Sequence, residues 1–221
     1  MTTKQRYTLA LQNLALMYPD AQTELEYTDT FQLLVAVILS AQCTDKRVNT
    51  VTPALFEKYP TCEAMAKADS SEIFPYIKSI SYPNSKSKYL VNCARQLVEK
   101  FNSQVPSDVE QLQTLQGVGR KTANVIASVV FKQAKMPVDT HVHRVCRRIG
   151  LTKNAKTVRQ TEDQLMKNIP LDDVAAVHHQ LILHGWYTCK ARKPLCTQCR
   201  LTDCCVFYSK EINKTPTDTI K

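Results

Sequence analysis

Apolar residues recur at intervals of three and four along most of the chain, which is the spacing of one face of an α-helix. The pattern predicts helices at 4–17, 31–39, 120–131, 140–149, 158–169 and 172–184, one that starts near Asp45 and ends at Pro60, and one that follows Asn84. Residues 125–131, VIASVVF, are rich in the β-branched side chains of strands, but they continue a helical start without a turn signal. The chain is therefore predicted to be all-α.

Polar residues at helix starts support this prediction. Asp45 can cap a helix, and Asp69 with Glu72 and Ser107 with Glu110 have the spacing of a capping box. Residues 209–221, SKEINKTPTDTIK, are polar and are expected to form a mobile tail.

The composition is that of a globular protein, because 43% of the 221 residues are hydrophobic. The N-terminus lacks the charged and then apolar layout of a secretory signal, and the strongest apolar run, 33–39, is too short to span a bilayer. We expect a soluble, intracellular protein without membrane contact, cytoplasmic and, in a bacterium, associated with the nucleoid.

The net charge of +9 comes from one part of the chain. Between Glu110 and Glu162 there are ten Lys or Arg and one acid, Asp139, whereas the rest of the chain has 19 cations and 19 acids. A basic stretch is often only a solvated face. Here the stretch also contains a glycine motif, and the two features together indicate a polyanionic partner, most simply nucleic acid.

That motif is LQGVGRKTANV, residues 115–125, in a chain with only four glycines. One helix is expected to end before Gly117 and the next to begin near Arg120. Glycine tolerates positive φ and lets another backbone approach. An ordinary interhelical turn is the default interpretation, but the basic surroundings favour a turn whose backbone N–H groups bind a phosphate at a helix N-terminus.

Five of the nine cysteines lie between 189 and 205. Four of them, Cys189, Cys196, Cys199 and Cys205, have the spacing C-x6-C-x2-C-x5-C. Clustered thiols without an export signal more often bind metal than form disulfides. The spacing suits zinc and a [4Fe-4S] cluster equally well, and Cys204 is a further thiol that could compete as fourth ligand. Packing roles are expected for the cysteines on helical stretches: Cys43, Cys62, Cys93 and Cys146.

Several motifs together resemble the DNA glycosylases of the endonuclease III family. LQGVGRKTANVI and PVDTHVHRVCRRIGL are similar to the family's helix-hairpin-helix and trailing aspartate. LSAQCTDKRVN upstream and HHQLILHGWYTC with the cysteines downstream extend the resemblance over most of residues 23–205. The family implies a bifunctional base-excision enzyme, expected to be a monomer, that acts on double-stranded DNA containing damaged pyrimidines or abasic sites.

The resemblance makes Lys121 the catalytic lysine and Asp139 the catalytic aspartate. A lysine amine can displace a base at C1′ and form a Schiff base that permits β-elimination, which an arginine cannot do. The alternative for Lys121 is a phosphate contact, and for Asp139 a helix N-cap, a role compatible with catalysis. The four spaced cysteines match the family's ligands to a [4Fe-4S] cluster, which would shape a basic loop carrying Lys190, Arg192 and Lys193.

Residues that contact DNA are implied in the same way. Gln42 would insert beside the orphan base with Asp45 nearby, and His141 matches the family's Thr-His pair. The hairpin contributes Gly117, Val118, Gly119 and Arg120. Relatives usually carry a glycine and then a bulky apolar residue at a second inserting position, where this chain has Ser81, Tyr82 and Pro83. Tyr82 could still insert or stack. For His178, His179 and His184 we expect core or capping roles rather than zinc binding.

The resulting prediction is two all-α domains with a DNA cleft between them. Residues 23–133 would form a helical barrel with the helix-hairpin-helix, and residues 1–22 with 134–208 the iron-sulfur cluster domain. An adenine-mismatch glycosylase of the same superfamily is the alternative enzyme, but it lacks the lysine nucleophile. A non-catalytic helix-hairpin-helix module with structural zinc is the alternative of another class.

Overall fold

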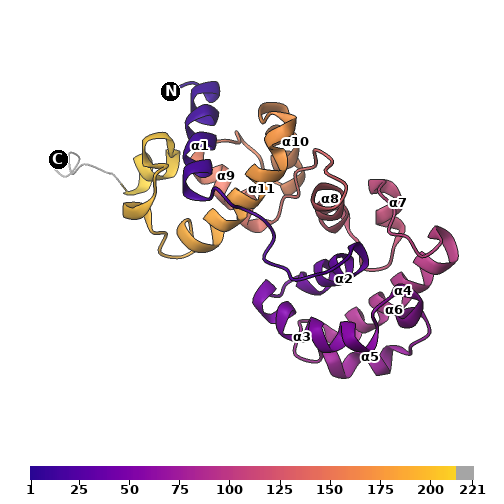
Figure 1. The fold of residues 1–221 in the computed structure, drawn as a ribbon. Helices are drawn as coiled ribbons and strands as arrows, with labels where there is room; N and C mark the ends of the chain where they lie inside the picture. Colours follow the sequence, from indigo (N-terminus) through magenta and orange to yellow (C-terminus); the bar gives the residue numbers. More distant parts are fainter. Residues whose placement is uncertain (213–221) are drawn as a thin grey trace. The chain divides into compact units, whose positions relative to one another are not determined.

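A computed structural model describes residues 1–212, and this part of the chain is helical without a strand (Figure 1). The α-helices are α1 (Thr3–Met17), α2 (Thr30–Ser40), α3 (Asp45–Lys58), α4 (Cys62–Ala66), α5 (Ser70–Ile77), α6 (Pro83–Phe101), α7 (Val109–Thr114), α8 (Arg120–Val129), α9 (Thr140–Ile149), α10 (Val158–Asn168) and α11 (Val174–Leu183). Short 3₁₀ turns are Leu171–Asp173, Cys196–Gln198 and Thr202–Cys204, and π-type turns are His184–Thr188 and Tyr208–Ile212. The all-α prediction is confirmed.

The chain divides into two compact units. One unit is the continuous segment Thr23–Gln133, which holds α2 to α8. The other joins Met1–Gln22 to the chain from Ala134 onward, so α1 packs with helices that lie more than a hundred residues later.

In the continuous unit, α2 is the central element. All seven residues from Leu33 to Leu39 are buried, so this helix is surrounded on every side. Helices α3, α6 and α8 pack against it, while α4 and α5 pack on α6. A helix that is apolar on all faces is stable only inside such a shell, and this burial gives the loops at its ends a rigid base.

In the discontinuous unit, the core is formed by α1, α9, α10 and α11. The buried hydroxyl of Tyr7 on α1 donates a 2.9 Å hydrogen bond to the carbonyl of Leu151, just after α9. The N-terminal helix is therefore joined to this unit by both packing and a buried polar contact.

Several expected boundaries change in the structure. Thr44, not Asp45, caps α3, and Asp45 is its first residue. Asp108 caps α7, so the expected pairing of Ser107 with Glu110 is wrong, whereas the Asp69–Glu72 capping box is present. The helix expected at 120–131 ends at Val129, and the one expected at 172–184 is divided into a 3₁₀ turn, α11 and the start of a π-type turn.

No helix among residues 1–212 is both long and apolar enough to cross a membrane. Of the tail expected over 209–221, residues 209–212 lie in the last π-type turn, and residues 213–221 lie outside the described part of the chain.

Candidate nucleic-acid interface and metal centre

The two glycines of the hairpin between α7 and α8 have different roles. Gly117 has φ +79°, where an L-residue is strained, and a Cβ there would lie 2.9 Å from the Cβ of Tyr89. Gly119 has an extended backbone, and a Cβ there would meet nothing within 4 Å. Val118 between them is buried, and its N–H donates to the carbonyl of Leu115. Gly117 therefore determines the shape of the turn, whereas Gly119 leaves the space beside the start of α8 open.

Helix α8 begins directly after Gly119, which caps it without a side-chain hydrogen bond. Arg120 and Lys121 are both exposed in its first turn. The N-terminus of a helix carries partial positive charge and unsatisfied N–H groups. Two cations added there, with no acid in the first turn, create a strongly anion-attracting surface.

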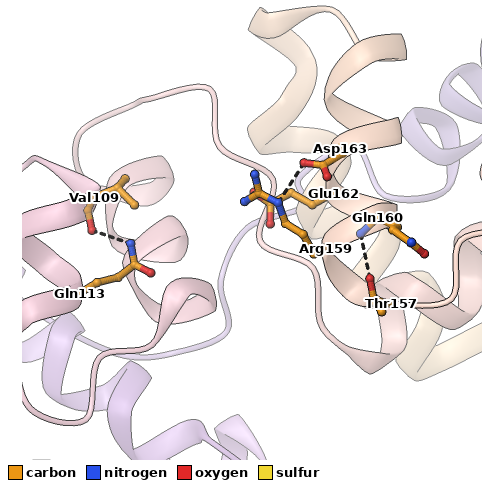
Figure 2. Close-up of polar contacts among 7 residues, drawn as sticks. All are labelled: Val109, Gln113, Thr157, Arg159, Gln160, Glu162 and Asp163. Carbon is orange, nitrogen blue, oxygen red and sulfur yellow. Dashed lines mark hydrogen bonds and ion pairs between the residues drawn. The ribbon is translucent and has the colours of Figure 1, made fainter.

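Figure 2 shows that one cation of the basic stretch is neutralised locally. Arg159 lies 3.1 Å from Asp163 and 3.6 Å from Glu162 on the same helix, α10, whose N-cap Thr157 accepts from Gln160. In the same view Gln113 donates to the Val109 carbonyl within α7, the first helix of the hairpin. Exposed cations of the same stretch also include Arg120, Lys121, Lys132, Arg147, Lys153 and Lys156.

Asp139 is the N-cap of α9. Its Oδ1 accepts hydrogen bonds from the N–H groups of His141 (2.8 Å) and Val142 (2.9 Å). The predicted N-cap is confirmed, and these bonds fix the orientation of a half-buried carboxylate. His141 is half-buried rather than at the open surface, and its ring lies edge-on to Trp186.

Gln42 and Tyr82 stand on two turns of the continuous unit. Both side chains are exposed, Tyr82 to 64%, and both residues have left-handed backbone, with φ 56° and 58°. The Ser81 hydroxyl donates a 2.7 Å hydrogen bond to the Gln42 carbonyl, which joins the two turns. Asp45 is half-buried in the first turn of α3.

Cys189, Cys196, Cys199 and Cys205 all line one cavity. Three of their sulfurs face N–H donors: Leu201 N to Cys199, Tyr208 N to Cys205, and Arg148 to Cys189, at 3.4–3.5 Å. Among the described residues, no group of three or more His, Cys, Asp or Glu is placed to hold a single metal ion. Four thiols that line one cavity fit a group that is ligated by four cysteines, such as an iron-sulfur cluster.

Burial raises the pKa of the Cys199 thiol to about 11, and it also raises the pKa of Cys196 and Cys205. The thiolate form therefore needs a cationic centre in the cavity, which is what an iron-sulfur group supplies. Cys204 does not line the cavity. It is buried among apolar side chains, and its thiol donates to the Leu201 carbonyl.

The basic loop after Cys189 is held by Arg148 of α9. The guanidinium donates to the carbonyls of Lys190 (2.7 Å) and Ala191 (3.0 Å), while the side chains of Lys190, Arg192 and Lys193 remain exposed. The sequence analysis missed this function of Arg148. Its only signal was a position in a basic stretch, which does not distinguish a loop anchor from a surface charge.

Two of the five histidines and three of the four remaining cysteines are core residues. His178 and His184 are buried, and burial lowers the pKa of His184 to about 4. His184 lies in the π-type turn after α11, where Nδ1 is 3.3 Å from the Tyr18 hydroxyl and Nε2 3.8 Å from the Cys199 sulfur. Cys62, Cys93 and Cys146 are buried in helices, but Cys43 lies in the turn before α3 and is half-buried.

Comparison with known proteins agrees with these features. Residues 35–171 match the HhH-GPD superfamily of base excision DNA repair proteins. Endonuclease III of Synechocystis is 47% identical over 91% of this chain and 92% of its own, and that of Escherichia coli is 43% identical over 87% and 90%. The chain therefore belongs to the endonuclease III family of this superfamily.

Solved structures of endonuclease III are also similar to this chain over nearly its whole length. An endonuclease III trapped in a covalent intermediate with DNA has a TM-score of 0.91 at 42% identity, covering 95% of this chain and 99% of that one. A non-covalent endonuclease III–DNA complex has a TM-score of 0.92 at 42% identity, covering 97% and 100%.

Proposed function

We propose that this chain removes oxidised pyrimidines from double-stranded DNA through a Schiff base on Lys121 and then cleaves the strand 3′ to the abasic site by β-elimination. As a member of its family it is a base excision repair enzyme, a DNA glycosylase and AP lyase. One observation carries the finer proposal. Lys121 is exposed in the first turn of α8, a helix that begins directly after Gly119, where a Cβ would meet no atom within 4 Å.

The chemistry requires a neutral Lys121 amine. Its nitrogen bonds to C1′ as the bond from C1′ to the base breaks, and the base leaves with the electron pair and takes up a proton. Opening of the sugar ring gives a protonated imine, which makes the C2′ proton acidic. Loss of that proton and cleavage of the C3′–O bond then release the 3′ phosphate.

Asp139 would have an electrostatic and proton-transfer role and would not be the nucleophile. Its carboxylate stabilises the positive charge that develops on the sugar and assists the proton transfers. One oxygen is held by the N–H groups of His141 and Val142, which supports a fixed orientation.

DNA is the proposed partner, bound by a monomer. The hairpin glycines and Arg120 would bind a phosphate at the start of α8, and the exposed Lys190, Arg192 and Lys193 another part of the backbone. Gln42 and Tyr82 would insert where the target nucleotide leaves the stack, with Asp45 and His141 close to the DNA. Tyr82 is larger than a usual aliphatic wedge, so it would influence lesion preference.

The proposed cofactor is a [4Fe-4S] cluster held by Cys189, Cys196, Cys199 and Cys205. When bound, it would supply cationic charge that favours the thiolate form of its half-buried cysteine ligands. The cavity that these residues share, and the N–H groups directed at their sulfurs, support this ligand set. The cysteines then fix the ends of the basic loop, whose carbonyls Arg148 already holds.

Borohydride trapping on a duplex with one abasic site tests the nucleophile. Wild type should form a covalent complex, and Lys121→Gln should abolish it while DNA binding persists. Lys58→Gln, which removes another exposed lysine at the end of α3, is the matched control and should trap normally. Absence of trapping by wild type, or trapping by Lys121→Gln, would reject the Schiff base on Lys121.

A further inference from the structure

A hydrogen bond joins the turn after α2 to the turn before α6. Ser81 and Gln42 are 39 residues apart, yet the Ser81 hydroxyl donates to the Gln42 carbonyl at 2.7 Å. Gln42 on the first turn and Tyr82 on the second are both exposed. A glycine or alanine at 81 could not make this bond, so the link depends on the side chain that this chain has there.

A buried cation fixes the base of the first of these turns, where α2 ends. The side chain of Lys86 on α6 is only 4% exposed, and its Nζ donates to the carbonyls of Leu39 (2.8 Å) and Ala41 (2.6 Å). These carbonyls lie at the C-terminal end of α2, where a helix leaves acceptors without intrahelical donors. A buried ammonium is costly unless hydrogen-bonded. Here it fixes the backbone immediately before Gln42.

The backbone at both tips is strained. Gln42 and Tyr82 have φ 56° and 58°, and the left-handed region is unfavourable for a residue as bulky as tyrosine. Packing of the side chain does not explain the left-handed backbone of Tyr82, because 64% of the residue is exposed. Such strain persists only where the surrounding contacts enforce it.

We infer that Ser81 is a positioning residue that holds Gln42 and Tyr82 as one pre-organised pair for insertion into DNA. The inference rests on the proposed function, because it requires these two side chains to enter the duplex. With the bond in place, the two turns approach DNA in a fixed geometry, and less conformational freedom is lost on insertion. Without it, each turn moves separately on the base fixed by Lys86.

The test compares wild type with Ser81→Ala, Tyr82→Ala and the double variant. The duplex carries a non-cleavable abasic analogue beside 2-aminopurine, whose fluorescence reports unstacking. Ser81→Ala should lower the rate of unstacking about twofold to tenfold, as expected for one neutral hydrogen bond. In the Tyr82→Ala background the same change should have little further effect, because Ser81 acts through the inserting pair.

Ser81→Thr, which keeps the hydroxyl, should restore most of the unstacking rate. Borohydride trapping of wild type on a duplex with one abasic site is measured in parallel, and its absence would reject the Lys121 proposal instead. Equal unstacking by wild type and Ser81→Ala, or fully additive effects of the two alanines, would overturn the positioning role.

Discussion

Gly117 lies so close to Tyr89 that no Cβ fits between them: the two Cβ atoms would be 2.9 Å apart. Tyr89 belongs to α6, so the turn of the hairpin is shaped against a long helix from another part of the same unit. The positive φ of Gly117 adds a second requirement for glycine. The hairpin glycines can therefore be separated by experiment.

Gly117→Ala should destabilise the protein by about 1–3 kcal/mol, because the new Cβ is both strained and in contact with Tyr89. Gly119→Ala meets no atoms within 4 Å and should lower the melting temperature less than Gly117→Ala does, through a weaker N-cap alone, while it weakens DNA binding by filling the space before α8. Thermal unfolding and DNA titration measure the two effects. Equal melting temperatures for the two variants would contradict this difference.

Asp139→Asn should separate the structural role of this residue from its proposed catalytic role. Asparagine caps helices about as well as aspartate, so the hydrogen bonds to His141 and Val142 can persist. Stability should change little, whereas the rate of base removal should fall strongly because the negative charge is gone. Asp139→Ala should lose the same activity and also about 1 kcal/mol of stability. Single-turnover assays and thermal unfolding test this, and an active Asp139→Asn would exclude the need for charge.

The two neighbouring thiols Cys204 and Cys205 should respond differently to substitution. Cys205→Ala removes a proposed ligand and should abolish absorbance at about 400 nm, the expected signature of the cluster. Cys204→Ala should keep the absorbance and lose some stability, because that thiol is packed in the core. Iron analysis of both purified variants is the second measurement. A colourless Cys204→Ala protein would show that Cys204 is a ligand and would contradict the proposed ligand set.

DNA binding should weaken steeply with salt. Lys190→Gln and Arg192→Gln should each reduce the slope of log K against log salt by about 0.9, if each side chain neutralises one phosphate. Lys58→Gln lies outside the proposed interface and should leave the slope unchanged. Titrations at several salt concentrations measure these slopes, and an unchanged slope in both loop variants would remove the loop from the interface.

His143 should make stability depend on pH in mildly acidic solution. Burial, and then the charge of Arg147, lower the pKa of His143, and its Nδ1 lies 2.7 Å from the buried Thr161 hydroxyl. Below a pH of about 6.5 the unfolded chain takes up a proton that the folded protein resists. The stability contribution of neutral His143 is therefore present above that pH and is lost as the pH falls through the folded pKa. His143→Gln should lose less melting temperature than wild type on acidification, and parallel losses would contradict this assignment.

The hydrophobic spacing was enough to predict the longer helices, because the periodicity of apolar residues is a local property of the sequence, whereas the short α4 was not predicted. Exact starts were less predictable. Thr44 and Asp45 are both good capping residues, and only the structure shows that Thr44 has the extended backbone of a cap. The sequence alone likewise cannot show that only Gly117 of the glycine pair has positive φ.

The remaining features depend on contacts between residues that are distant in sequence. Arg148 reaches the carbonyl of Lys190 across 42 positions, and Ser81 reaches Gln42 across 39. Neither residue type has a spacing pattern that indicates such a bond. The ligand set and the hairpin were predicted because their residues are close neighbours in the chain.

The unit that contains α1 is completed only by the last part of the chain to be synthesised. During translation, Tyr7 must remain without its partner Leu151 until more than a hundred further residues have left the ribosome, whereas the unit from Thr23 to Gln133 is already complete. The continuous unit can thus fold first, and the exposed apolar face of α1 is a target for chaperones in the interval. Truncation within α1 or within residues 134–212 would therefore damage the same unit.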